Sequence, residues 1–137
     1  MDRAIFPIKN ELVFTDKILI EVNGIPLFMV CKGSKGTYYL AISIDYEILA
    51  YYVFKTDLNF LYQMLIGKIT IMEAITESDE LYLVQLKGSS EYKEPIHKIS
   101  YNELKADLLP EPDKKFKILN RDIAEYTEKL KEKLTKM

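Results

Sequence analysis

The fold is decided by one stretch of the sequence, which reads TYYLAISIDYEILAYYVF from Thr37 to Phe54. Aromatic and β-branched residues dominate it, and both types favour the pleated, half-buried surface of a β-strand. It contains neither glycine nor proline, and a polar cluster at 45–47 divides it in two. Polar residues between two apolar runs are typical of a turn. The stretch therefore predicts two antiparallel strands at the centre of a sheet, over residues 37–44 and 48–54.

Further strands are predicted on both sides of this central pair. An Asn-Gly pair at 23–24 separates apolar runs over 17–22 and 25–31. Asn-Gly supplies the two positive-φ residues of a type I′ turn, which is the strongest short-range sign of a hairpin. A turn at 33–36 leads into the central stretch, and the run 81–86 indicates another strand. The pattern predicts an up-and-down meander of about five strands.

Helical periodicity replaces the strand pattern after the central pair. Apolar residues at three- and four-residue steps predict a helix over 57–66, with Thr56 or Asp57 as its cap. Capping boxes begin at Thr70 and Ser100, each with a glutamate three residues later. In such a box the two side chains satisfy each other's free backbone amides. We expect a helical turn after the first box and a short helix after the second.

The longest predicted helix occupies residues 120–137, with Asn120 as its cap. Nearly all of its surface is charged except for one apolar stripe. A helix of this length is marginal alone in water, so the stripe must be buried against its own sheet or against a second subunit. We favour the second arrangement, a symmetric homodimer or another protein partner. The expected contact residues on this stripe are Tyr126, Leu130, Leu134 and Met137.

The chain has 137 residues and 48% hydrophobic residues, which fits one domain with an ordinary core. Within it we expect a compact unit over 1–110, a proline-containing linker over 111–119 and the amphipathic helix over 120–137. The predicted fold class is α+β: an antiparallel β-meander packed with short helices, followed by the C-terminal helix.

Composition narrows the range of functions. The net charge is −2, so no global basic field attracts nucleic acid or acidic membranes. The single cysteine, Cys31, excludes an intramolecular disulfide and any multi-cysteine metal site. The longest apolar run is far short of the ~20 residues that span a bilayer. We expect a cytoplasmic protein without cofactor or metal.

The preference for lysine over arginine, with abundant isoleucine and tyrosine, indicates a bacterial or phage source.

Catalytic patterns are not evident in the sequence. Cys31 and His97 are far apart, and no local motif joins them into a thiol dyad. Acidic residues at 77–80 lack the glycine and ligand spacing of a calcium loop, so a solvated turn is the better interpretation. We therefore expect a protein that is not an enzyme. A small enzyme with dispersed carboxylates is kept as an alternative.

Tyrosine is the unusual residue, with ten copies in the chain. The pairs at 38–39 and 51–52 lie on the two central strands, and adjacent residues of a strand point to opposite faces. If only one face carries helices, the other displays tyrosines, which favour interfaces. We take Tyr39 and Tyr52 as candidate contact residues. The alternative is that helices cover both faces.

Three segments resemble a family of uncharacterised bacterial and phage domains. They are Asn23–Phe28, Gly36–Leu40 and Leu65–Ala74, and the resemblance covers residues 17–86. The family is a domain of unknown function. The resemblance therefore implies a compact α+β domain and brings no catalytic residue to this chain.

Together these patterns favour a non-catalytic protein-interaction or regulatory module, a small bacterial or phage accessory protein that self-associates. One alternative is a nucleic-acid-binding protein that uses the sheet tyrosines with Lys32, Lys35 and Lys55. Another is an inhibitor or antagonist of a host or phage defence system. No membrane partner is expected.

Overall fold

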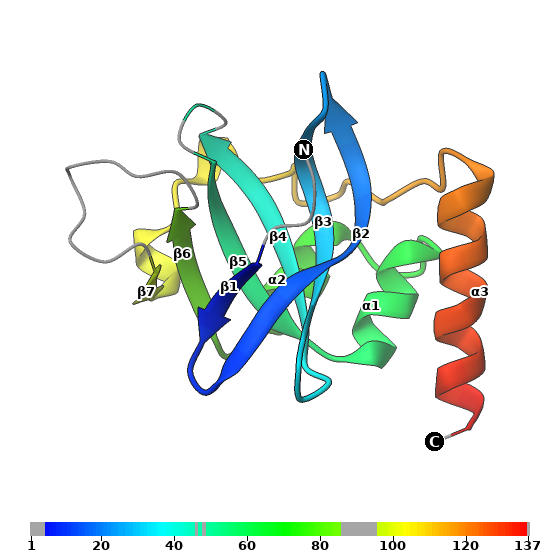
Figure 1. Cartoon of the computed structure of the whole chain (residues 1–137). Helices are drawn as coiled ribbons and strands as arrows, with labels where there is room; N and C mark the ends of the chain where they lie inside the picture. The colour runs from blue at the N-terminus through cyan, green and yellow to red at the C-terminus, as the bar shows by residue number, and fades with distance from the viewer. Residues whose placement is uncertain (1–4, 46, 48, 86–95, 137) are drawn as a thin grey trace.

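The computed structural model shows a curled antiparallel sheet with helices on one side (Figure 1). It describes residues 5–45, 47, 49–85 and 96–136. In these ranges the strands are β1 (Ile5–Ile8), β2 (Glu11–Val22), β3 (Ile25–Gly33), β4 (Tyr38–Asp45), β5 (Ala50–Thr56), β6 (Leu81–Gln85) and β7 (Ile96–Ile99). The helices are α1 (Leu58–Leu65), α2 (Ile71–Thr76), α3 (Arg121–Thr135) and the 3₁₀ turns η1 (Tyr101–Glu103) and η2 (Ala106–Leu108).

The predicted meander is confirmed, since each strand of the described chain pairs with its neighbour in sequence from β1 to β7. The central hairpin is β4 and β5, and the Asn-Gly hairpin is β2 and β3. Five strands is an underestimate, because β1 and β7 were not predicted. Each has only four residues, and β1 contains Pro7. Such short runs carry little periodicity, and they are held by pairing with a longer neighbour.

The sheet curls until its first and sixth strands share one core. Phe6 and Ile8 of β1 pack in the same inner cluster as Tyr82 and Val84 of β6. The opposite face packs against the helices and includes Leu61 and Met64 of α1 together with residues of α2 and α3. The curl buries the inner face without any helix. The fold is therefore an α+β domain whose sheet is nearly a barrel.

The predicted helix caps form as the sequence indicates. Asp57, rather than Thr56, accepts a 2.8 Å hydrogen bond from the amide of Phe60. In the capping box, Thr70 Oγ1 accepts from the Glu73 amide and Glu73 Oε1 accepts from the Thr70 amide, both at 3.0 Å. Local side-chain geometry thus sets these helix starts.

The second capping box produces less helix than predicted. Ser100 precedes η1, and the chain then passes through η2, so the region contains two 3₁₀ turns in place of one α-helix. Tyr101 has a tertiary role here, because its hydroxyl lies 2.7 Å from the carbonyl of Ile75 and 2.6 Å from that of Ser78. Contacts with the end of α2 therefore position this segment.

Segment 111–119, which we expected to be a linker, is anchored to the domain at Phe116, while its other residues are exposed. Phe116 is buried and meets Phe28 of β3 edge-on, with ring centroids 6.2 Å apart. The amide of Ile71 donates a 3.0 Å hydrogen bond to the carbonyl of Lys114. This segment consequently fixes the place at which α3 begins, beside β2 (Figure 1).

Candidate functional site

The apolar stripe of α3 is buried against its own chain. Ile123 and Leu130 are fully buried in the helix-side core, Tyr126 and Leu134 are half-buried, and α3 contacts α1 and β2. Met137 lies outside the described residues. The stripe therefore takes the alternative arrangement, in which it folds back onto its own chain. A role of Tyr126 and Leu134 in contact with a partner stays a prediction. The oligomeric state itself stays a prediction.

Polar contacts also attach α3 to the sheet. The hydroxyl of Tyr126 donates a 2.6 Å hydrogen bond to Oδ2 of Asp16, and Lys17 forms an ion pair with Asp122. Burial, followed by the hydrogen bond to Asp16, raises the pKa of the Tyr126 phenol. The phenol therefore stays protonated, and its O–H group remains available to donate a hydrogen bond to Asp16.

The sheet tyrosines do not form an exposed platform. Tyr39 is 3% exposed in the inner core, and Tyr52 is 4% exposed on the helix side. The two rings do lie on opposite faces, as strand alternation predicts. Both faces are nonetheless buried, one by helices and the other by the curl of the sheet. The prediction that Tyr39 and Tyr52 reach the surface is wrong, and the stacking surface of the nucleic-acid alternative is lost with it.

Cys31 and His97, the two residues considered for a thiol dyad, lie on different strands. Cys31 is fully buried in β3, and burial raises the pKa of its thiol to about 12, which opposes formation of the reactive thiolate. His97 lies on β7, which is at the opposite side of the molecule from α3 (Figure 1). Among the described residues, no three His, Cys, Asp or Glu side chains are grouped as a metal site.

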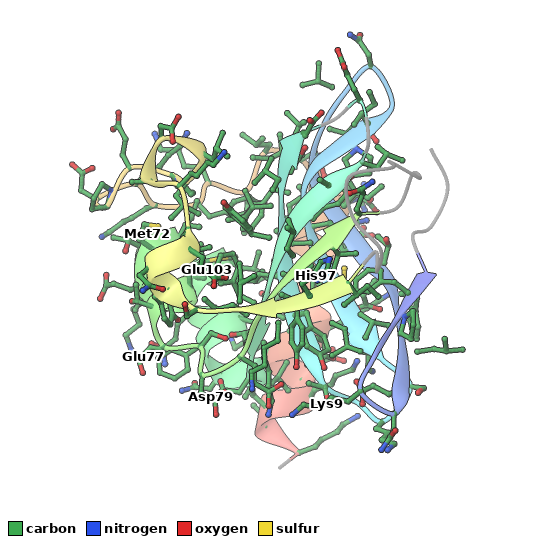
Figure 2. All side chains as sticks on the ribbon, turned by 90° about the vertical axis from the view of Figure 1, so that its left-hand side faces the viewer. Lys9, Met72, Glu77, Asp79, His97 and Glu103 are labelled. Atoms are coloured by element: carbon green, nitrogen blue, oxygen red, sulfur yellow. The ribbon has the colours of Figure 1, made fainter. Side chains whose placement is uncertain are left out.

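A charged cluster closes the curled sheet at one end. Oε1 of Glu80 lies 2.6 Å from Nζ of Lys9 and 3.8 Å from Nζ of Lys55, while Oε2 accepts a 2.8 Å hydrogen bond from Tyr82. The hydrogen bond from Lys9 is the main reason that the pKa of Glu80 is lowered. Lys9 occupies the turn between β1 and β2, visible at this end in Figure 2. The cluster joins that turn to the start of β6, which is a structural role.

Part of β2 lies at an edge of the sheet. β1 pairs only with residues 11–14 of β2. Within the described chain, residues 15–22 therefore have a partner strand on one side only, which is β3. Register shifts after Thr15 and after Ile18 mark bulges in this stretch. Bulges hinder the addition of another strand to the edge of a sheet. A partner that binds beside residues 15–22 would therefore contact side chains and would not extend the sheet.

Two hollows lie beside this stretch, and Ile20 and Leu119 line both of them. The acidic hollow, of about 530 Å³, lies between β2 and the start of α3 and contains three carboxylates and one ammonium group: Asp16, Glu21, Asp122 and Lys17. The basic hollow, of about 540 Å³, lies along segment 113–117 and contains three ammonium groups and one carboxylate: Lys114, Lys115, Lys117 and Asp113. We call the two hollows and the apolar residues between them the Leu119 surface.

Leu119 is the most exposed large apolar residue in the described chain, with 66% of its surface accessible. It directly precedes the cap Asn120, a position from which an apolar residue often packs onto the fourth residue of the helix. That residue here is Ala124, whose side chain is too short to cover Leu119. Its neighbour Ile118 is also exposed, at 41%. The centre of the surface is therefore apolar and uncovered.

Sequence reasoning missed this surface, although one indication was present. Ile118 and Leu119 form an apolar doublet inside a stretch of charged residues that we expected to be a linker. Their exposure depends on Phe116, which takes the buried position next to them.

Comparison with known proteins does not assign the chain to a family. A scan against protein-family models, a search of curated proteins and a search of solved structures each find no match for the chain. None of the helices in the described ranges combines the length and the apolar character needed to cross a membrane.

Proposed function

We propose that the chain is a non-catalytic protein-interaction module that binds through the Leu119 surface. The observation that carries the proposal is the exposure of Leu119 between two hollows of opposite charge. Protein interfaces commonly combine an apolar centre with a polar rim. Opposite charges on the two sides favour one orientation of the partner and disfavour others.

The position of Leu119 supports the proposal. The buried ring of Phe116 and the helix cap at Asn120 flank residues 117–119, so this short exposed stretch is anchored at both ends. A surface that is already ordered loses less conformational entropy when it binds. Binding at residues 117–119 therefore costs less conformational entropy than binding at an equally apolar but mobile segment would.

Site-specific photocrosslinking tests the proposal. A photoreactive amino acid replaces Leu119 in the full chain, and the protein is irradiated in the cells that produce it. Leu12 is the matched control, since it is 56% exposed and lies on β2 outside both hollows. We expect a discrete protein adduct from position 119 and none from position 12.

A second variant checks that the adduct depends on the whole surface. Replacement of both Lys115 and Lys117 with glutamate reverses the net charge of the basic hollow and should abolish the adduct at position 119. Equal labelling from positions 12 and 119, or no adduct from 119, would overturn the proposal.

A further inference from the structure

The Leu119 surface is complementary to itself. Its two hollows have similar volumes, about 530 and 540 Å³, and they adjoin at the shared residues Ile20 and Leu119. One hollow has an excess of carboxylates and the other an equal excess of ammonium groups. A half-turn about an axis through Leu119 exchanges the positions of the two hollows. It therefore sets the acidic hollow of one copy against the basic hollow of another, and it does so twice.

We propose that the partner at this surface is a second copy of the chain, related by a two-fold axis that passes close to Leu119. The inference rests on the proposed function and names the partner. In a two-fold interface the same patch is used by both subunits, so each favourable contact occurs twice. The Leu119 side chains of both copies lie at the axis and cover one another. The acidic and basic hollows meet on either side of them.

This arrangement differs from a dimer through the stripe of α3 or through strand pairing. The α3 stripe is buried within its own chain, and the bulges of β2 hinder continuous pairing of two sheets. Contact through the Leu119 surface leaves both features unchanged. It predicts that association depends on charge as well as on apolar contact, so salt should weaken the dimer.

The first experiment measures mass against concentration. Sedimentation equilibrium of the full chain should show a monomer–dimer equilibrium at low salt that shifts toward monomer as salt is added. Leu119→Asp places an unpaired carboxylate at the axis and should weaken the dimer by about tenfold or more, which corresponds to about 1.4 kcal/mol. Leu12→Asp makes the same chemical change outside the surface and should leave the dimer unchanged. Circular dichroism confirms that both variants fold.

The second experiment tests the charge arrangement. Glu21→Lys lowers the negative charge of the acidic hollow, and Lys117→Glu lowers the positive charge of the basic hollow. Each variant alone should dimerise more weakly than the wild type. An equimolar mixture should associate more strongly than either variant alone, because the unaltered basic hollow of one meets the unaltered acidic hollow of the other. A general loss of folding in the variants would not produce this recovery.

Three results would overturn the inference. They are a monomer mass at every concentration, a dimer that Leu119→Asp does not weaken, and a mixture that associates no better than its components. The proposed function fails separately, since it requires an adduct at position 119 with any protein. An adduct with a different protein, together with a monomer mass, overturns the second copy as partner and leaves the protein-interaction role in place.

Discussion

The hydroxyl of Tyr126 lies 2.6 Å from Oδ2 of Asp16, across 110 positions of sequence. Asp16 falls at the register shift between Thr15 and Lys17, where β2 has a residue without a direct partner on β3. A bulge of this kind turns a side chain out of the normal alternation of a strand. Here it gives α3 a carboxylate to bind. The irregularity of β2 therefore supplies one of the contacts that hold α3 on the sheet.

Replacement of Tyr126 with phenylalanine tests this contact. The change removes the hydrogen-bond donor and leaves the half-buried Asp16 carboxylate without it. Hydrogen bonds to charged groups contribute about 1.5–3 kcal/mol, and partial exposure of Asp16 puts the expected loss near the lower end. Urea denaturation measures the free energy of unfolding. Tyr62→Phe, on α1, is the matched control and should have a much smaller effect. Equal losses in the two variants would contradict the assigned role.

The capping box at Thr70 provides a prediction for local structure. Thr70→Ala removes the oxygen that accepts from the Glu73 amide and should lower the free energy of unfolding by about 1 kcal/mol. Thr56→Ala is the control, because Asp57 rather than Thr56 caps α1. A denaturation midpoint for Thr70→Ala equal to that of the wild type would show that the box does not stabilise the protein.

Gly33 is expected to depend on Glu11. A Cβ atom at Gly33 would overlap Oε1 of Glu11, so an alanine there must displace the glutamate side chain. This also breaks the 3.3 Å hydrogen bond between Thr37 and Oε2 of Glu11. We expect Gly33→Ala to lower the free energy of unfolding by about 1 kcal/mol.

The same substitution should be nearly neutral once Glu11 is alanine, because nothing then occupies the space of the new methyl group. A double-mutant cycle by urea denaturation measures this coupling. Additive losses from the two changes would contradict the predicted contact.

Glu80 should contribute to the loss of stability in acid. Its pKa is lowered in the folded chain, first by the hydrogen bond from Lys9, so the folded state binds this proton less readily than the unfolded state. The stabilisation is fully present above the usual carboxyl pKa and is lost as pH falls through the lower native pKa. Glu80→Gln should therefore flatten the acid side of the stability profile measured by urea denaturation.

Lys9→Met should produce part of the same flattening, because it removes the largest cause of the lowered pKa. Lys131→Met, which removes an exposed lysine of α3, is the control and should preserve the wild-type slope. Profiles for Glu80→Gln and wild type that run parallel into acid would rule out this linkage.

Local chemistry made the central part of the fold predictable. The Asn-Gly pair specifies its own turn, alternation places Tyr39 and Tyr52 on opposite faces, and Asp57, Thr70 and Asn120 satisfy amides only three residues ahead. Each of these features depends on neighbours within one turn or one strand. They are therefore visible in a single sequence.

The candidate site was not predictable in the same way. Leu119 belongs to a doublet that the pattern alone assigns to a linker, and its exposure follows from the contact of Phe116 with Phe28, far away in sequence. The two hollows combine residues of β2 with residues of segment 113–122. No periodicity connects such distant segments, so only packing brings their charges together.

The sequence by itself determined that α3 has an apolar stripe that must be buried, and that the central strands carry a tyrosine on each face. Tertiary structure alone decided what covers them: α1 and β2 cover the stripe, and the curl that joins β1 to β6 covers the inner tyrosines. The physical reason is that the hydrophobic effect favours burial without specifying a direction. A sequence shows which side chains must leave water, whereas the surface that receives them depends on how the whole chain packs.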